Sequence, residues 1–285
     1  MSVNVKETIV LITGANKGNG YGRSKLLFHL QLSQAEETLR LATAVALLKS
    51  SHPYLILVGA RSAAKAETAI EQLKQSVTLT KSSLAPIVVD LYSDDSIAKL
   101  GKDIAAHYGR LDVLVNNAGQ NLDTDTSLST REVFQKTFDV NITGQHILTQ
   151  TLVPYLLKSS APRLIFVSSD VGTFDETTIQ GHPMNAELPA GWPKPYSYEV
   201  PAYRSSKTAL NMIMLDWFRI LRNDHVKVWC VAPGFLATDL GGHKDYSAST
   251  GALDPSVGGE RVKAVVEGEW DEHTGRLVGS QVFAW

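Results

Sequence analysis

The sequence predicts one α/β domain with a doubly wound parallel sheet of about seven strands and helices on both faces. Short β-branched and aliphatic runs recur along the chain and are nearly continuous, which is typical of strands buried on both faces. Segments with a helical pattern separate these runs, so successive strands are expected to lie parallel. The 285 residues contain no internal repeat and no linker, so a single domain is expected to span 1–285.

The expected elements alternate in order along the chain. Strands are expected at 8–13, 54–59, 86–90, 111–116, 163–168 and 226–231, with a weaker one near 276–283. Helices are expected at 62–76, 93–108, 130–158, 202–222 and 255–267.

Composition excludes several classes of protein. A formal net charge of -2 gives no basic field for nucleic acid. Cys230 is the only cysteine, so no internal disulfide can form, and its apolar neighbours predict a buried side chain. No apolar run reaches the ~18 residues of a membrane span. The start of the chain leads directly into a strand without a signal peptide, so a cytoplasmic protein without membrane contact is expected.

A glycine-rich loop, Thr13-Gly14-Ala15-Asn16-Lys17-Gly18-Asn19-Gly20, follows the first expected strand. Glycines there allow a tight turn and let the backbone approach a pyrophosphate, as in dinucleotide sites. Glycine-rich turns without a ligand are also common, so the loop alone is weak evidence.

The nucleotide preference is predicted from residues at the ends of the next strands. Arg61 stands where an acidic residue would accept from a free ribose, and Lys17 lies in the loop nearby. Two cations suit a 2′-phosphate, which favours NADP(H) over NAD(H). Asp90 is expected either to accept from the adenine amino group or to cap a helix.

These residues, with others in the same order, resemble the short-chain dehydrogenase/reductase family over nearly the whole chain, and in particular its carbonyl-reductase-like members of fungal type. The further matches are Asn116-Asn117-Ala118-Gly119, Asn141, Ser169, Tyr203 with Lys207, and Pro233-Gly234-Phe235-Leu236-Ala237-Thr238. The resemblance implies a Rossmann-type fold and a catalytic set of Asn141, Ser169, Tyr203 and Lys207. It also implies cofactor contacts at Gly14, Asn16, Lys17, Gly18, Asn19, Gly20, Arg61, Asp90, Leu91, Asn117, Ala118, Gly119, Tyr203, Lys207, Pro233, Gly234, Leu236 and Thr238.

The spacing of Tyr203 and Lys207 places both on one face of a helix. A nearby ammonium lowers the pKa of a phenol, which is otherwise about 10. Tyr203 is therefore expected to exchange a proton with a substrate oxygen, to which Ser169 would donate a hydrogen bond. By the resemblance, Lys207 would also hold the nicotinamide ribose, and Asn141 would hold a water that leads to solvent. No metal-ligand cluster is expected.

The predicted activity is an NADP(H)-dependent interconversion of a small-molecule carbonyl and an alcohol. The alternative is a cofactor-binding homologue without redox turnover, regulatory or recruited to another biosynthetic step. Segments 171–202 and 239–255 are expected to be substrate-side loops. In carbonyl reductases a similar segment before the tyrosine covers the surface through which other family members pair their subunits. This resemblance favours a monomer over a homo-oligomer.

The connection between the first two strands departs from the family pattern. Residues 14–53 are far more than one loop–helix–loop crossover needs, and the excess falls at 22–41. Ser33 to Glu36 reads as a capping box that opens a helix to about Lys49, whereas the pyrophosphate site needs a helix N-terminus directly after Gly20. Three interpretations stay open: a bulged insertion, a lid over the cofactor, or translation of an unspliced intron.

Overall fold

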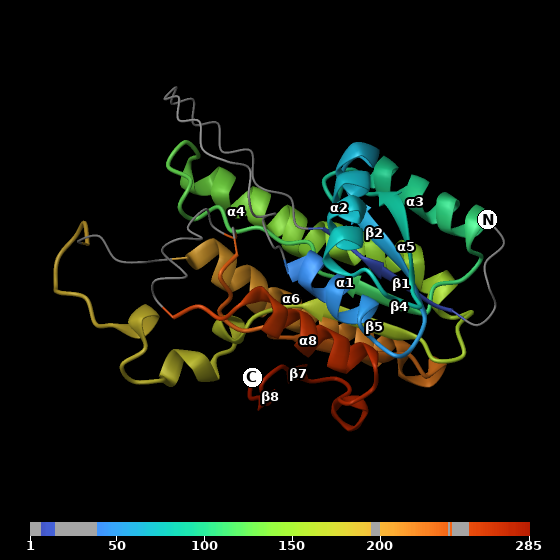
Figure 1. Ribbon diagram of the computed structural model, residues 1–285. Coiled ribbons are helices and arrows are strands. Elements are labelled where there is room, and N and C mark those ends of the chain that lie inside the picture. The colour runs from blue at the N-terminus through green and yellow to red at the C-terminus, as the bar shows by residue number, and fades with distance from the viewer. Residues whose placement is uncertain (1–6, 15–38, 195–199, 239, 241–250) are drawn as a thin grey trace.

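The fold is a single mixed sheet between two layers of helices (Figure 1). The computed structural model describes residues 7–14, 39–194, 200–238, 240 and 251–285. Its eight strands lie in the order β3-β2-β1-β4-β5-β6-β7-β8. They are β1 (Thr8–Ile12), β2 (Tyr54–Ala60), β3 (Ser83–Val88), β4 (Val113–Asn116), β5 (Arg163–Val167), β6 (Lys227–Val231), β7 (Leu277–Val278) and β8 (Val282–Phe283). The first seven pair in parallel, which confirms the predicted fold class.

Two strands differ from the sequence prediction. β3 begins at Ser83 and includes Pro86, which the edge of a sheet tolerates because the missing N–H is not needed by a second neighbour. The weak strand expected near 276–283 is two short strands, β7 and antiparallel β8. A turn at Gly279, whose N–H donates to the carbonyl of Gln281, reverses the chain between them.

The helices described are α1 (Leu39–Leu48), α2 (Ala63–Ser76), α3 (Asp94–His107), α4 (Thr130–Phe138), α5 (Gln145–Leu156), α6 (Pro201–Leu221) and α8 (Pro255–Val266). Alternate residues of the strands point to opposite faces. Ile9 and Leu11 of β1 pack in a core with α3, α5 and α6, whereas Val10 and Ile12 pack in a second core with α1, α2 and α8. The sheet is therefore covered on both faces, and the blue α1 lies beside the red α8 (Figure 1).

The helix expected at 130–158 is interrupted. A π-helical segment, Asp139–Gly144, separates α4 from α5 and contains Asn141. A Cβ on Gly144 would lie 2.4 Å from the carbonyl oxygen of Leu91, so only glycine allows this close approach. The widened turn therefore packs against the loop after β3. π-bulges of this kind are frequent at functional sites.

Part of the predicted excess segment lies within the described residues. Residues 39–41 form the first turn of α1, and Leu41 is buried in the core. The capping box at Ser33 and residues 22–38 lie outside the described residues. Within the described part of the chain, no helix is long and apolar enough to cross a membrane.

Candidate active site

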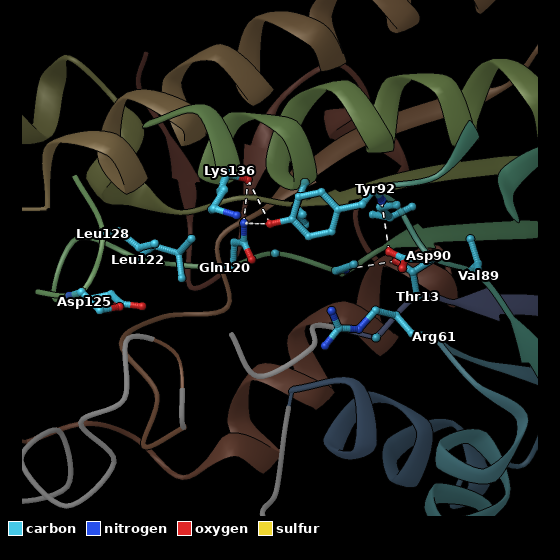
Figure 2. A pocket seen from close by; sticks show the side chains of 16 residues that line it. Thr13, Arg61, Val89, Asp90, Tyr92, Gln120, Leu122, Asp125, Leu128 and Lys136 are labelled. Atoms are coloured by element: carbon cyan, nitrogen blue, oxygen red, sulfur yellow. Dashed lines mark hydrogen bonds between the residues drawn. The ribbon is translucent and has the colours of Figure 1, made fainter. Parts of the chain in front are cut away.

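The carboxyl ends of the strands open into a cavity of about 440 Å³ (Figure 2). Its walls come from the ends of β1 and β2, the loops after β3 and β4, and helix α4. Of the predicted cofactor residues, those that line it are Gly14, Arg61, Asp90, Leu91, Ala118 and Gly119. The structure thus brings together residues from four separate strand ends, at the place where doubly wound sheets bind ligands.

Polar side chains at this cavity are already ordered by hydrogen bonds. Asp90 accepts from the amide of Tyr92 at 3.1 Å, while Ser93 is the residue that caps α3. The amide of Gln120 donates from Nε2 to the hydroxyl of Tyr92 and to the carbonyl of Lys136, both at 2.6 Å. Figure 2 shows this group between Asp90 on one side and Leu122 and Leu128 on the other. These hydrogen bonds therefore hold this wall of the cavity in place without a ligand.

Thr13 joins the end of β1 to the segment after β4. Its Oγ1 accepts from the amides of Asn117 and Ala118, each at 3.0 Å, and its carbonyl accepts from Asn117 Nδ2 at 2.8 Å. Asn117 is buried, and Ala118 also accepts from Gln145 at 2.6 Å. The segment predicted to border the cofactor is thus held by buried side chains from both β1 and α5.

Tyr203 and Lys207 lie one turn apart on α6, as their spacing predicts. Lys207 Nζ lies 5.5 Å from the centroid of the Tyr203 ring and donates to the carbonyl of Val167 at 2.8 Å. Lys207 is only 3% exposed, and this burial lowers the pKa of its ammonium group to about 8.

Ser169 is brought to the same helix by close packing. It precedes a 3-10 turn, Asp170–Gly172, in which a Cβ on Gly172 would lie 2.7 Å from Cβ of Lys207. Only glycine lets this turn rest on α6. The Ser169 hydroxyl is half-buried and donates to Asp170 Oδ1 at 3.1 Å, so its proton is oriented by the next residue.

Asn141 is fully buried in the π-helical segment. Its Oδ1 accepts from the amide of Gln120 at 2.8 Å, and its Nδ2 donates to the carbonyl of Gln120 at 3.0 Å and to Ser206 Oγ at 2.9 Å. The side chain therefore ties the segment after β4 to α6, one residue before Lys207.

The loop predicted to lie against the nicotinamide is held at both ends. Arg261 of α8 donates from Nη1 to the carbonyl of Pro233 at 2.8 Å. Further along, Leu236 forms a bridge with Leu253, and the amide of Ala237 donates to the Leu253 carbonyl at 2.9 Å. The described part of this loop ends at Thr238. After it, only Leu240 is described before residue 251.

The residues present fit a nicotinamide dinucleotide. A cavity with a cation at the end of β2 and a carboxylate at the end of β3 suits a phosphorylated ribose and an adenine amino group. Gly119 joins this cavity to Lys207, because a Cβ there would lie 3.5 Å from Lys207 Nζ. Among the described residues, no group of three or more His, Cys, Asp or Glu could hold a metal ion. The predicted contacts at Asn16, Lys17, Gly18, Asn19 and Gly20 lie outside the described residues.

The expected substrate-side segment 171–202 presents large apolar side chains to solvent. Phe174 is 70% exposed and Trp192 is 87% exposed. Arg204 of α6 fixes the base of the segment, because its Nε donates to the carbonyl of Val171 at 2.8 Å and its Nη2 to Asn185 Oδ1 at 3.3 Å. Of the other expected loop, 239–255, only residues 240 and 251–255 are described.

Sequence reasoning missed several residues of this region. Gly144 stood inside an expected helix, and an isolated glycine in a helical pattern was the available signal. Gln120 and Asp123 follow the predicted cofactor contact at Gly119, but no local pattern marks them. Their hydrogen-bond partners are distant in the sequence. Arg40, whose Nη1 donates to the carbonyl of Gly59 at 2.7 Å, lies in the segment 22–41 that the sequence predicts to be an excess.

Comparison with known proteins gives the family. Residues 32–180 match the short chain dehydrogenase family. The chain is 42% identical over 277 residues to the short-chain dehydrogenase/reductase eupG of Phoma sp, covering 93% of this chain and 92% of the relative. It is 39% identical over 272 residues to the short-chain dehydrogenase/reductase tropE of Talaromyces stipitatus, covering 94% of each.

Solved structures agree on the fold. The NADPH-bound carbonyl reductase from chicken fatty liver superimposes with a TM-score of 0.71 at 20% identity, covering 99% of this chain and all of that one. The carbonyl reductase Sniffer of D. melanogaster gives a TM-score of 0.69 at 24% identity, covering 98% of this chain and 100% of that chain. At these identities the likeness shows the architecture alone, whereas the Phoma and Talaromyces sequences match over more than nine-tenths of each chain. The chain therefore belongs to the short-chain dehydrogenase/reductase family.

Proposed function

We propose that this chain is an NADP(H)-dependent oxidoreductase that interconverts a carbonyl compound and an alcohol, with Tyr203 as the general acid/base. The observation that carries the proposal is the buried Lys207 ammonium, 5.5 Å from the centroid of the Tyr203 ring and beside the wall of the cavity. Burying a charged group costs free energy, and a side chain with a purely structural role would have no need of the charge. A phenol that must give up a proton near neutral pH benefits from it.

In reduction, bound NADPH would supply a hydride to the carbonyl carbon. Tyr203 would give its phenolic proton to the carbonyl oxygen, and Ser169 would turn its hydroxyl from Asp170 to donate to the same oxygen. The two donors stabilise the charge that develops there. In oxidation, bound NADP⁺ would accept the hydride from the alcohol carbon, the phenolate would take the alcohol proton, and Lys207 would stabilise that phenolate.

Two features support NADP(H) over NAD(H). Arg61 lines the cavity at the end of β2, where the adenosine ribose of a dinucleotide would bind. Guanidinium groups bind phosphate in a bidentate way. The chicken carbonyl reductase of the same fold is a complex with NADPH. Lys17, beyond the described residues, is proposed as the second cation.

The test uses purified protein with NADPH and a panel of ketones, aldehydes and quinones. We expect NADPH oxidation with some members, at least about a hundredfold less with Tyr203→Phe, and nearly unchanged NADPH binding by titration. Tyr155→Phe, on α5, is the matched control and should keep full activity. Turnover that survives Tyr203→Phe would refute the role of Tyr203. NADPH binding without oxidation of any panel member would favour the cofactor-binding homologue without redox turnover.

A further inference from the structure

The first turn of α6, which carries Tyr203, obtains its hydrogen-bond partner from a distant part of the chain. The N-cap residue, Val200, has no polar side chain with which to accept from the first amides. Asp123 fills this place from the loop after β4: Oδ1 accepts from the amide of Ala202 at 2.9 Å and Oδ2 from the amide of Tyr203 at 2.8 Å. Both carboxylate oxygens thus bind the helix end, where its dipole favours negative charge.

The main chain that carries Asp123 is itself held in place. The amide of Asp123 donates to Oδ1 of Asn121 at 3.1 Å, which forms a tight turn just before it. One residue earlier, both main-chain groups of Gln120 are bound by the side chain of Asn141. The segment 120–123 therefore has little freedom to move relative to the buried π-helical segment.

The hydrogen bonds close into a ring through the tyrosine. Asn141 Nδ2 donates to Ser206 Oγ at 2.9 Å, and Ser206 Oγ donates to the carbonyl of Tyr203 at 2.7 Å. Tyr203 is thus bound at its N–H by Asp123 and at its C=O by Ser206. The N–H and the C=O of Tyr203 are therefore both connected, through these hydrogen bonds, to Asn141 and the segment 120–123.

We propose that Asp123 is a positioning residue for the reaction: its carboxylate fixes the main chain of Tyr203, so that the phenol stays aligned with the reacting carbonyl. This inference rests on the proposed function. Proton transfer needs heavy atoms within hydrogen-bond reach, and a misplacement of about 1 Å costs up to about a hundredfold in rate. Fixing both main-chain groups of the general acid, rather than only its side chain, reduces such misplacement.

The experiment compares Asp123→Ala, Asp123→Asn and Ser129→Ala in the full-length enzyme. Ser129→Ala removes the cap of α4, where Ser129 accepts from the amide of Glu132, and so controls for the loss of any helix cap. We expect Asp123→Ala to lower kcat at least tenfold, with substrate KM and the NADPH dissociation constant within about twofold of wild type. Asp123→Asn keeps one acceptor oxygen and should recover part of the loss. Hydrogen–deuterium exchange over residues 200–206 should rise in Asp123→Ala and stay unchanged in Ser129→Ala.

Two results would overturn the proposal. One is a kcat of Asp123→Ala within twofold of wild type. The other is a parallel loss of kcat, NADPH binding and thermal stability in which Asp123→Asn is no better than Asp123→Ala. Wild type and Tyr203→Phe are measured in the same assay. A wild type without Tyr203-dependent turnover refutes the proposed function itself, whereas an active wild type with an equally active Asp123→Ala refutes only the role of Asp123.

Discussion

Arg40 lies directly against Gly14, the first glycine of the predicted phosphate loop. A Cβ on Gly14 would be 2.6 Å from Arg40 Nη1, and the same nitrogen donates to the carbonyl of Gly59 at 2.7 Å. Residues 15–38 thus begin and end at neighbouring points of the fold. A helix N-terminus beside the loop is what a pyrophosphate requires, and Arg40 belongs to the described part of α1.

The proximity of Gly14 and Arg40 predicts the effect of a deletion. Removing residues 22–38, which leaves the described part of α1 whole, should join the glycine loop to that helix through a short connection and tighten NADPH binding by about tenfold, since the amides at the new helix end would then face the phosphates. Titration of NADPH into both proteins measures the change. A dissociation constant that rises on deletion would instead identify the segment as a lid over the cofactor.

The position of Arg61 predicts a preference for NADPH over NADH. Arg61→Leu should weaken NADPH by about tenfold or more and leave NADH nearly unchanged, because only NADPH carries the 2′-phosphate that a guanidinium would bind. Dissociation constants for the two nucleotides give the ratio directly. Arg131→Leu, at an exposed position of α4, removes the same charge and should change neither. Equal losses for both nucleotides would place Arg61 away from the phosphate.

Burial of Lys207 predicts a pH-dependent stability of the cofactor-free protein. The folded-state pKa, about 8, lies below the unfolded value of about 10.4. Below pH 8 the lysine is charged in both states and its desolvation reduces stability. Between pH 8 and about 10.4 the unfolded chain binds the proton that the folded one has lost, so stability rises with pH.

Lys207→Met should therefore be more stable than wild type at pH 7, with the advantage shrinking as the pH rises toward 10. Urea unfolding at several pH values measures the difference. Lys99→Met, which removes an exposed lysine paired with Asp103, should show no such trend. An advantage of the same size at every pH would show that burial does not lower the pKa of Lys207.

The close contact of Gly144 with Leu91 predicts a link between the π-helical segment and the cavity. In Gly144→Ala the new methyl group would meet the Leu91 carbonyl at 2.4 Å, so Leu91, which lines the cavity, must move. We expect a loss of about 1–3 kcal/mol in the free energy of unfolding and weaker NADPH binding. Gly101→Ala, in α3, meets only a methyl group of Thr151 and should affect stability without affecting NADPH affinity. Unchanged NADPH binding in Gly144→Ala would break the proposed link.

Much of this protein follows from local patterns in the sequence. Buried strands such as Thr8–Ile12 and Lys227–Val231 are nearly continuous apolar runs, and the four-residue spacing of Tyr203 and Lys207 places them on one helical face whatever surrounds them. Such features depend on residues close in the sequence, so a single chain is enough to predict them. The interruption of 130–158 and the two short final strands depend on what Gly144 and Gly279 contact. A glycine in a helical pattern signals a break, but it does not identify the distant group against which the chain packs.

The remaining features were decided by tertiary structure. Asp123 binds the start of a helix that lies about eighty residues further along the chain, and Asn141 joins two segments that only the sheet brings together. The charge state of Lys207 depends on how deeply the fold buries it, since desolvation is a property of the whole surroundings. The sequence by itself thus determined the family, the sheet and the residues that we propose as reacting groups. Their alignment and their ionisation came from packing between distant residues, because hydrogen bonds and burial act through space rather than along the chain.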